Sequence, residues 1–153
     1  MIENILLNKW FYSFVVGWIL FFILIDWTEF SKNIWGGIVA MVLELWQDGT
    51  ADKVGFYYMK DRGISLFNIP IFFTFGVVFT MGVLFIQYLP KNPKLQLIHI
   101  IAFASGFLVF ELIVTEFGLL VEPHWNHMGS FFDTIIIMGS LVWLKQYILY
   151  RKT

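Results

Sequence analysis

The sequence predicts an all-α integral membrane protein, a bundle of about five helices that forms a single transmembrane domain over residues 1–153. Hydrophobic residues make up 59% of the chain and charged residues only 14%, whereas soluble domains carry about a quarter charged residues. The charges fall almost entirely in the gaps between apolar runs. Several of these runs approach the length of about 20 residues that a membrane-spanning helix needs. The lipid bilayer is therefore the first predicted partner.

The expected helices are the five apolar segments, residues 10–25, 34–46, 65–89, 95–120 and 131–149. We expect the first to remain in the protein as a span, because it ends at Asp26 and Trp27 and not at a small-residue cleavage site. The second is short and reaches only about 20 Å. It either crosses a thinned region or is re-entrant. Its small residues favour a span packed against its neighbours: Gly36, Gly37 and Ala40.

Small residues also occur in the last three segments. They are Gly76 and Gly82 in the third, the run Ala104, Ser105 and Gly106 in the fourth, and Gly139 and Ser140 in the fifth. Small side chains let membrane helices approach closely. We therefore expect helix contacts at these positions.

The distribution of Lys and Arg predicts the orientation. With five spans, one side holds six of the ten basic residues: Lys32, Lys91, Lys94, Lys145, Arg151 and Lys152. Cytoplasmic loops of membrane proteins carry an excess of Lys and Arg. We therefore expect a multi-pass protein of the cell membrane whose C-terminus lies in the cytoplasm. If the second segment does not cross, the tally stays six to four. Charge counting therefore does not choose between four spans and five.

Glu111 is the strongest functional pointer because it lies within the apolar segment 95–120. A carboxylate in hydrocarbon must be neutralised, paired or turned toward a polar cavity. Glu44 and Asp48 are four residues apart, on one face of a helix. The predicted orientation puts several such groups in the outer half of the bundle. We expect them to line an outward-opening pocket among the second to fifth helices: Glu44, Asp48, Asn68, Glu111 and Asp133.

Aromatic and polar residues from the connecting segments are expected near the mouth of this pocket: Tyr57, Tyr58, Trp125 and Asn126. The run from Val54 to Tyr58 follows a turn signal at Asp48 and Gly49, and could form a short strand or helix over the pocket. The alternative is chance clustering at a membrane interface. In that alternative Glu111 is protonated or hydrogen-bonded as a structural element.

The loop EPHWNH gives a weak metal signal. Glu122, His124 and His127 are residue types that bind zinc, but a complete site needs three or four ligands and the loop guarantees only two histidines. The alternative is an interfacial loop in which Trp125 lies among the lipid headgroups and the histidines titrate in water. The chain has no cysteine, which excludes thiolate sites. No cofactor is predicted.

A resemblance covers most of the chain. The arrangement comprises QDGTADKVGFYYMKD, FNIP opening a span, IQYLPKNPK, an FE-containing span and PHWNHMGSFFD, with Asp48, Tyr58, Pro70, Pro90, Glu111, Trp125 and Asn126 in matching positions. It resembles a family of small multi-pass membrane proteins from spore-forming Gram-positive bacteria. The resemblance implies a bacterial cytoplasmic membrane and carries no activity or residue role.

The sequence leaves three classes of function open. The formal charge of −1 and the absence of a basic stripe argue against a nucleic-acid partner. No GxGxxG, GxSxG, HExxH or Walker pattern occurs, which favours a non-enzymatic accessory protein that binds a partner membrane protein. The first alternative is a transporter-like protein that binds a small solute or ion through its intramembrane acids. The second is a membrane-embedded enzyme acting on a lipid or isoprenoid.

Overall fold

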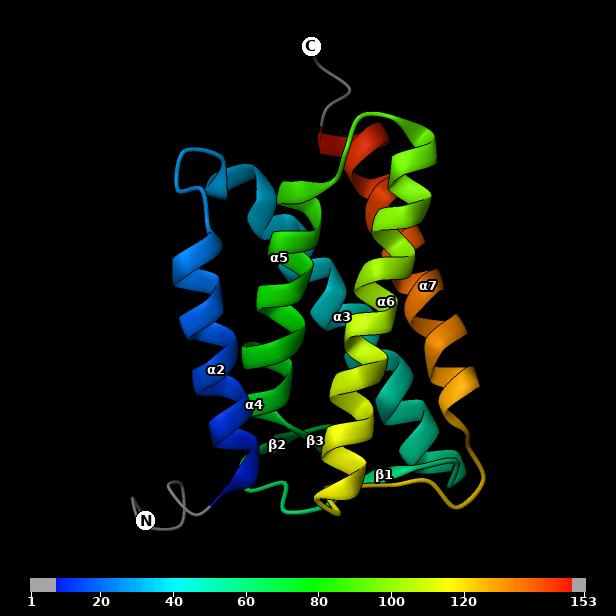
Figure 1. Cartoon of the computed structure of the whole chain (residues 1–153). Coiled ribbons are helices and arrows are strands. Elements are labelled where there is room, and N and C mark those ends of the chain that lie inside the picture. The colour runs from blue at the N-terminus through cyan, green and yellow to red at the C-terminus, as the bar shows by residue number, and fades with distance from the viewer. Residues whose placement is uncertain (1–7, 150–153) are drawn as a thin grey trace.

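The computed structural model describes residues 8–149, which form an all-α bundle of five helical rods (Figure 1). The predicted fold class is therefore confirmed. The rods are α2 (Lys9–Leu24), α3 (Phe30–Val54), the continuous helix α4–η1–α5 (Ile71–Phe73, Thr74–Val78 and Phe79–Tyr88), α6 (Pro93–Glu116), and α7 (His127–Leu144) with η2 (Lys145–Leu149). Neighbouring rods in the chain run in opposite directions, so the connecting segments gather at the two ends of the bundle.

Within residues 8–149, three helices are long and apolar enough to cross a membrane: Ile71–Tyr88, Pro93–Glu116 and His127–Leu149. In the first, 67% of the residues of its most apolar stretch are buried, and this helix forms the centre of the bundle. In the other two only 17% and 22% of these residues are buried. The outer helices therefore present long apolar faces on the outside of the molecule. Exposure of such faces to water is unfavourable, whereas contact with the hydrocarbon of a lipid bilayer is favourable.

The second rod is longer than its apolar run. Residues 34–46 are only the middle of α3, which has 25 residues and a length of about 37 Å. The expectation of a short second helix is wrong, because flanking polar residues stay helical where α3 packs along α5. In Figure 1 α3 runs the height of the bundle without turning back, which favours a full traverse over a re-entrant segment.

Glycines allow α3 and α5 to approach closely. A Cβ added at Gly36 would lie 2.3 Å from Ile86 Cγ1 and 2.6 Å from the Gly82 carbonyl oxygen. A Cβ at Gly82 would lie 2.7 Å from that of Ala40. The small-residue surface predicted for the second segment is thus confirmed as a contact surface, and its partner is α5, whose backbone it contacts directly.

The small-residue patches of the fourth and fifth segments are confirmed for Ala104, which is fully buried, but not for their glycines. A Cβ added at Gly106 or Gly139 would meet no atom within 4 Å among the described residues. Both glycines lie on outer helices, α6 and α7, which are mostly exposed. Sequence alone does not tell which face of a helix its small residues occupy.

One end of the bundle, which we call the hairpin end, consists of segments 55–70 and 117–126. Strands β2 (Ser65–Leu66) and β3 (Ile69–Pro70) form a tight hairpin there. Its turn residues, Phe67 and Asn68, have φ angles of 51° and 69°. The predicted third segment, 65–89, is therefore helical only from Ile71 onward.

A second strand pair joins the two segments of the hairpin end. Strand β1 (Tyr58–Met59) pairs in antiparallel fashion with β4 (Leu120–Val121). Helix α6 ends at Glu116, and Gly118 has a φ of 68° that turns the chain toward β4. The fourth helix is thus shorter than the predicted segment 95–120, because its last apolar residues form a strand.

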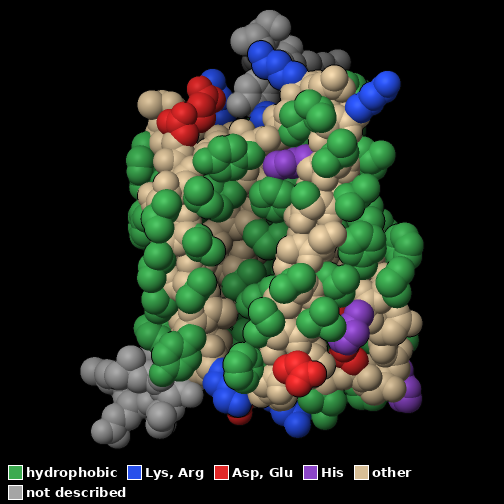
Figure 2. All heavy atoms as spheres, in the orientation of Figure 1, with side chains coloured by type: hydrophobic (Ala, Val, Ile, Leu, Met, Phe, Trp, Pro, Cys, Tyr) green, Lys and Arg blue, Asp and Glu red, His purple; other side chains and the backbone are tan. Residues whose placement is uncertain are grey.

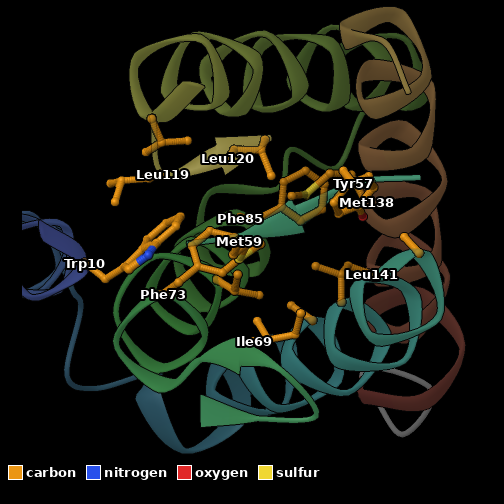
Figure 3. Packing of buried hydrophobic residues seen from close by; sticks show 14 of the residues in the cluster. Trp10, Tyr57, Met59, Ile69, Phe73, Phe85, Leu119, Leu120, Met138 and Leu141 are labelled. Carbon is orange, nitrogen blue, oxygen red and sulfur yellow. The ribbon is translucent and has the colours of Figure 1, made fainter. Parts of the chain in front are cut away.

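A hydrophobic cluster lies beneath the strands (Figure 3). Trp10 is 1% exposed and its ring lies 5.4 Å from that of Phe73, centroid to centroid. The Trp10 Nε1 donates a 2.8 Å hydrogen bond to the Lys60 carbonyl. Met59 of β1 and Leu120 of β4 belong to the same cluster. This packing fixes the strands across the hairpin end of the bundle.

The opposite end, the basic end, carries the described members of the basic set: Lys32, Lys91, Lys94 and Lys145. They lie at the start of α3, at the α5–α6 turn and near the end of α7. The last described residues, at the end of η2, lie at the same end (Figure 1). Arg151 and Lys152, which the orientation also counted, lie outside the described residues.

Candidate functional site

A cavity of about 80 Å³ lies among α3, α5, α6 and α7, toward the hairpin end. Five acidic residues contribute to its wall: Glu44 and Asp48 of α3, Glu111 of α6, Glu122 after β4, and Asp133 of α7. Among the described residues that line it there is no Lys or Arg. The cavity therefore gathers negative or protonated groups from separate parts of the chain inside an apolar bundle.

Glu44 is the most isolated of these acids. It is 5% exposed, and neither of its carboxyl oxygens makes a hydrogen bond of good geometry with a described residue. Asp48 and Thr74 are its polar neighbours. A buried polar atom that lacks a partner costs free energy, so a native structure retains one only for a reason.

Asp48 lies one helical turn beyond Glu44 and is also buried. Its Oδ1 accepts a 2.5 Å hydrogen bond from the Tyr57 hydroxyl. Burial, followed by the nearby charge of Asp48, raises the pKa of the Tyr57 phenol above its ordinary value. The hydroxyl therefore stays protonated and remains a donor to the carboxylate.

Glu111 and Asp133 complete the acidic wall from the other side. Asp133 of α7 is close enough to Asp48 for their charges to interact. Glu111 of α6 is 5% exposed, and its nearest polar partners are His127 and Ser130. Carboxyl groups from α3 and from the α6–α7 pair thus face one common cavity.

The rest of the wall is mostly apolar and rich in aromatic rings and methionine: Phe73, Met81, Phe107, Phe110 and Met138. Helix α6 packs mainly against α7 and only weakly against α5. Figure 2 shows a hollow in the face between the α4–η1–α5 helix and α6, with hydrophobic side chains around it. The site therefore combines a charged side on α3 with an apolar side beneath a lipid-compatible surface.

A second group of polar side chains borders the cavity, and we call Glu111, Glu122 and His127 the Glu–Glu–His cluster. The His127 Nδ1 lies 2.8 Å from Glu111 Oε1 and 3.3 Å from Glu122 Oε2. One ligand-type atom from each residue lies within 4.8 Å of the other two. Both carboxylates thus approach the same imidazole nitrogen.

Backbone hydrogen bonds hold Glu122 beside the other two residues. Val121 pairs with Tyr58 in the β1–β4 ladder, and the His124 amide donates to the Phe56 carbonyl at 3.2 Å. Glu122 lies between these two fixed points. Its placement therefore depends on the β1–β4 pair and not on a flexible loop.

The start of α7 is equally well defined. The Asn126 side chain caps the helix by accepting a hydrogen bond from the Gly129 amide at 2.8 Å. Trp125 stacks on Phe56 and donates from Nε1 to Ser130 Oγ at 2.8 Å. As the first residue of α7, His127 is directed toward α6 by this capped turn.

The structure brings together most, but not all, of the predicted pocket. Glu44, Asp48, Glu111, Asp133 and Tyr57 line the cavity. Trp125 lies beside it, with its ring 5.8 Å from that of Tyr57. Binding of a ligand by these residues stays a prediction.

Three predicted pocket residues lie elsewhere. Asn68 is exposed in the β2–β3 turn, where its amide donates to Asp52 Oδ2 at 2.8 Å. Tyr58 is 37% exposed on β1 and does not line the cavity. Asn126 is a helix cap. The prediction is wrong for Asn68, because the β2–β3 hairpin, which sequence periodicity does not reveal, holds it in an exposed turn away from the cavity. Tyr58 pairs with Val121 in the β1–β4 ladder next to Tyr57, and its place near the mouth stays a prediction.

The residues that could bind a metal in the structure differ from those predicted from the sequence. His124 is exposed and lies outside the Glu–Glu–His cluster, whereas Glu111, sixteen residues before His127, belongs to it. The sequence pointed to a compact loop motif and missed a partner on the preceding helix. It also missed Gln47, Phe107 and Phe110 as wall residues. Phe107 lies four residues before Glu111 and Gln47 three residues after Glu44, so helical spacing puts each on the same face as an acid, whereas Phe110 has no such signal.

Comparisons with protein-family models, curated proteins and solved structures found no match for this chain. The family resemblance stays a prediction, as does everything it implies. The function is therefore argued from the geometry of the cavity and its acids.

Proposed function

We propose that this chain is a multi-pass membrane protein that binds a small organic cation in the acid-lined cavity. The observation that carries the proposal is Glu44, a buried acid whose two oxygens lack good hydrogen-bond partners among the described residues. It lies next to Asp48 on a wall without Lys or Arg. An arrangement of this kind is complete only when a proton or a cation joins it.

Electrostatics explains why a cation suits this position. Two carboxylates one helical turn apart repel each other, and removal from water makes each charge more costly. A positively charged group between Glu44 and Asp48 offsets both penalties at once. The Tyr57 hydroxyl already donates to Asp48, whereas the polar neighbours of Glu44 are Asp48 and Thr74 and neither of them is a cation.

The remaining wall favours an organic cation over a bare inorganic ion. Phe107, Phe110 and Met81 offer apolar and aromatic surface opposite the acids. Aromatic faces attract ammonium groups, and methionine adapts to irregular apolar ligands. A cavity of about 80 Å³ accommodates only a few non-hydrogen atoms. The ligand class is thus a small primary amine with a short apolar chain.

The proposal includes a location. We place the protein in a bacterial cytoplasmic membrane with the basic end, and with it the C-terminus, in the cytoplasm. The six-to-four division of Lys and Arg in the sequence and the apolar outer faces of α6 and α7 support this placement. The cavity then lies in the outer half of the membrane, toward the hairpin end.

The common cavity favours solute binding over the other two classes of function. A purely structural Glu111 requires no shared space with Glu44 and Asp48, whereas all three line one cavity here. The accessory role and the membrane-embedded enzyme stay predictions that no specific feature of the geometry favours.

A thermal-stability assay with ligand series tests the proposal. The purified protein in detergent is heated with alkylammonium ions of one to six carbons and, separately, with the alcohols of equal length. A ligand that binds only the folded state raises the melting temperature. We expect a rise with the short amines and none with the alcohols. Equal shifts with both series would show that only apolar partitioning occurs.

A further inference from the structure

We infer that the Glu–Glu–His cluster is a binding site for a divalent first-row transition ion, of which Zn²⁺ is the best match. Glu111, Glu122 and His127 supply two carboxylates and one imidazole, a donor set that zinc accepts. The inference does not rest on the proposed function, because the ion would bind even if the cavity held no amine.

The distances are compatible with a shared metal ion after small movements of the side chains, because all three ligand-type atoms lie within 4.8 Å of one another. Ligands at 2.0–2.2 Å from a tetrahedral zinc lie about 3.3 Å from one another. The Nδ1 of His127 lies 2.8 Å from one carboxylate and 3.3 Å from the other. Small side-chain rotations would therefore bring all three ligand atoms onto one ion. A single protonated nitrogen, by contrast, satisfies two carboxylates poorly, because Nδ1 carries only one hydrogen.

Glu122 provides an independent pointer to a ligand. Its side chain is only 9% exposed, and its Oε1 is buried with no hydrogen-bond partner among the described residues. The β1–β4 ladder and the contact between His124 and Phe56 hold it there. A strand pair thus keeps a buried, underused carboxylate beside a histidine, which is the situation that a bound cation resolves.

The site is open to solvent and leaves coordination positions for further ligands of the ion. The His127 side chain is 39% exposed, which leaves a route from solvent for the ion. Three protein ligands leave at least one coordination position for water or another ligand, as in open zinc sites. Glu111 and Glu122 both border the cavity, so this position lies next to it.

Metal titration of the purified full-length protein tests the inference. Zn²⁺ binding is measured by calorimetry, and Co²⁺ is used in parallel because its visible absorption reports ligand geometry. We expect one ion per chain. His127→Gln and Glu122→Gln should each weaken binding by at least about tenfold. His124→Gln is the matched control, three residues away and exposed, and should leave the affinity unchanged.

Two outcomes would overturn the inference. One is the absence of stoichiometric Zn²⁺ or Co²⁺ binding to the wild-type protein, which does not depend on the folding of any variant. The other is an equal affinity of the His127→Gln and His124→Gln variants. Glu44→Gln should keep full Zn²⁺ affinity, so failure of amine binding and failure of metal binding are separable.

Discussion

The Tyr57 hydroxyl donates a 2.5 Å hydrogen bond to Asp48 Oδ1, and this bond links the segment after α3 to the buried acidic face of the same helix. Removal of the donor leaves a buried carboxyl group with an unsatisfied oxygen. We expect Tyr57→Phe to lower the free energy of unfolding by about 1–3 kcal/mol. Denaturant unfolding in mild detergent measures this. Tyr58→Phe is the control, because that side chain is 37% exposed.

The contact between α3 and α5 should tolerate no added methyl group. Gly36→Ala would place a Cβ 2.3 Å from Ile86 Cγ1 and force the helices apart. We expect a loss of about 1–3 kcal/mol in the free energy of unfolding. Gly106→Ala, on the open face of α6, should instead leave stability unchanged or raise it by about 0.5–1 kcal/mol. A comparison of melting temperatures decides this, and equal losses in both variants would contradict the observed packing.

Lys145 stabilises the basic end of the bundle by a bond to backbone carbonyls. Its Nζ donates to the Ile86 carbonyl at 2.6 Å and to that of Leu89 at 3.4 Å, near the end of α5. Lys145→Met keeps the length of the side chain but removes the donor. We expect the variant to be less stable by about 1–3 kcal/mol in thermal or denaturant unfolding. Lys94→Met, an exposed position in the first turn of α6, should have little effect.

The proposed orientation is tested by two C-terminal fusions. The account places Thr153 in the cytoplasm, because the predicted topology assigns six of the ten Lys and Arg residues of the sequence to the same side as the C-terminus. A fluorescent protein that folds only in the cytoplasm should therefore be bright after Thr153, and alkaline phosphatase at the same position should be inactive. Active phosphatase with a dark fluorescent fusion would reverse every assignment of sides.

The helical architecture was predictable because burial in hydrocarbon imposes a strong compositional signal. Long apolar runs identified the helices, and small residues marked Gly36 and Gly82 as contact positions, although the pairing of α3 with α5 came only from the structure. The acids Glu44 and Glu111 were recognisable because charge is rare in such segments. Their meeting in one cavity was inferred from the orientation and is found in the structure.

The hairpin end was not predictable in the same way. Two-residue strands such as β1 and β4 give no periodicity, so the pairing of Tyr58 with Val121 has no signature in the sequence. That pairing sets Glu122 beside His127, whereas the separate β2–β3 hairpin holds Asn68 away from the cavity. The candidate metal ligands were therefore recognisable by residue type, but the choice of Glu111 over His124 required the fold.

The most direct test of the central claim is a calorimetric titration of the wild-type protein with butylammonium, alongside Glu44→Gln, Asp48→Asn and Glu116→Gln. The last is an exposed acid at the end of α6 and serves as the control. The account predicts saturable binding of one amine per chain in the wild type and the control. It predicts at least about tenfold weaker binding in the other two, since each loses one charge beside the ammonium group. Equal binding by Glu44→Gln and the wild type, or no saturable binding by the wild type, would contradict it.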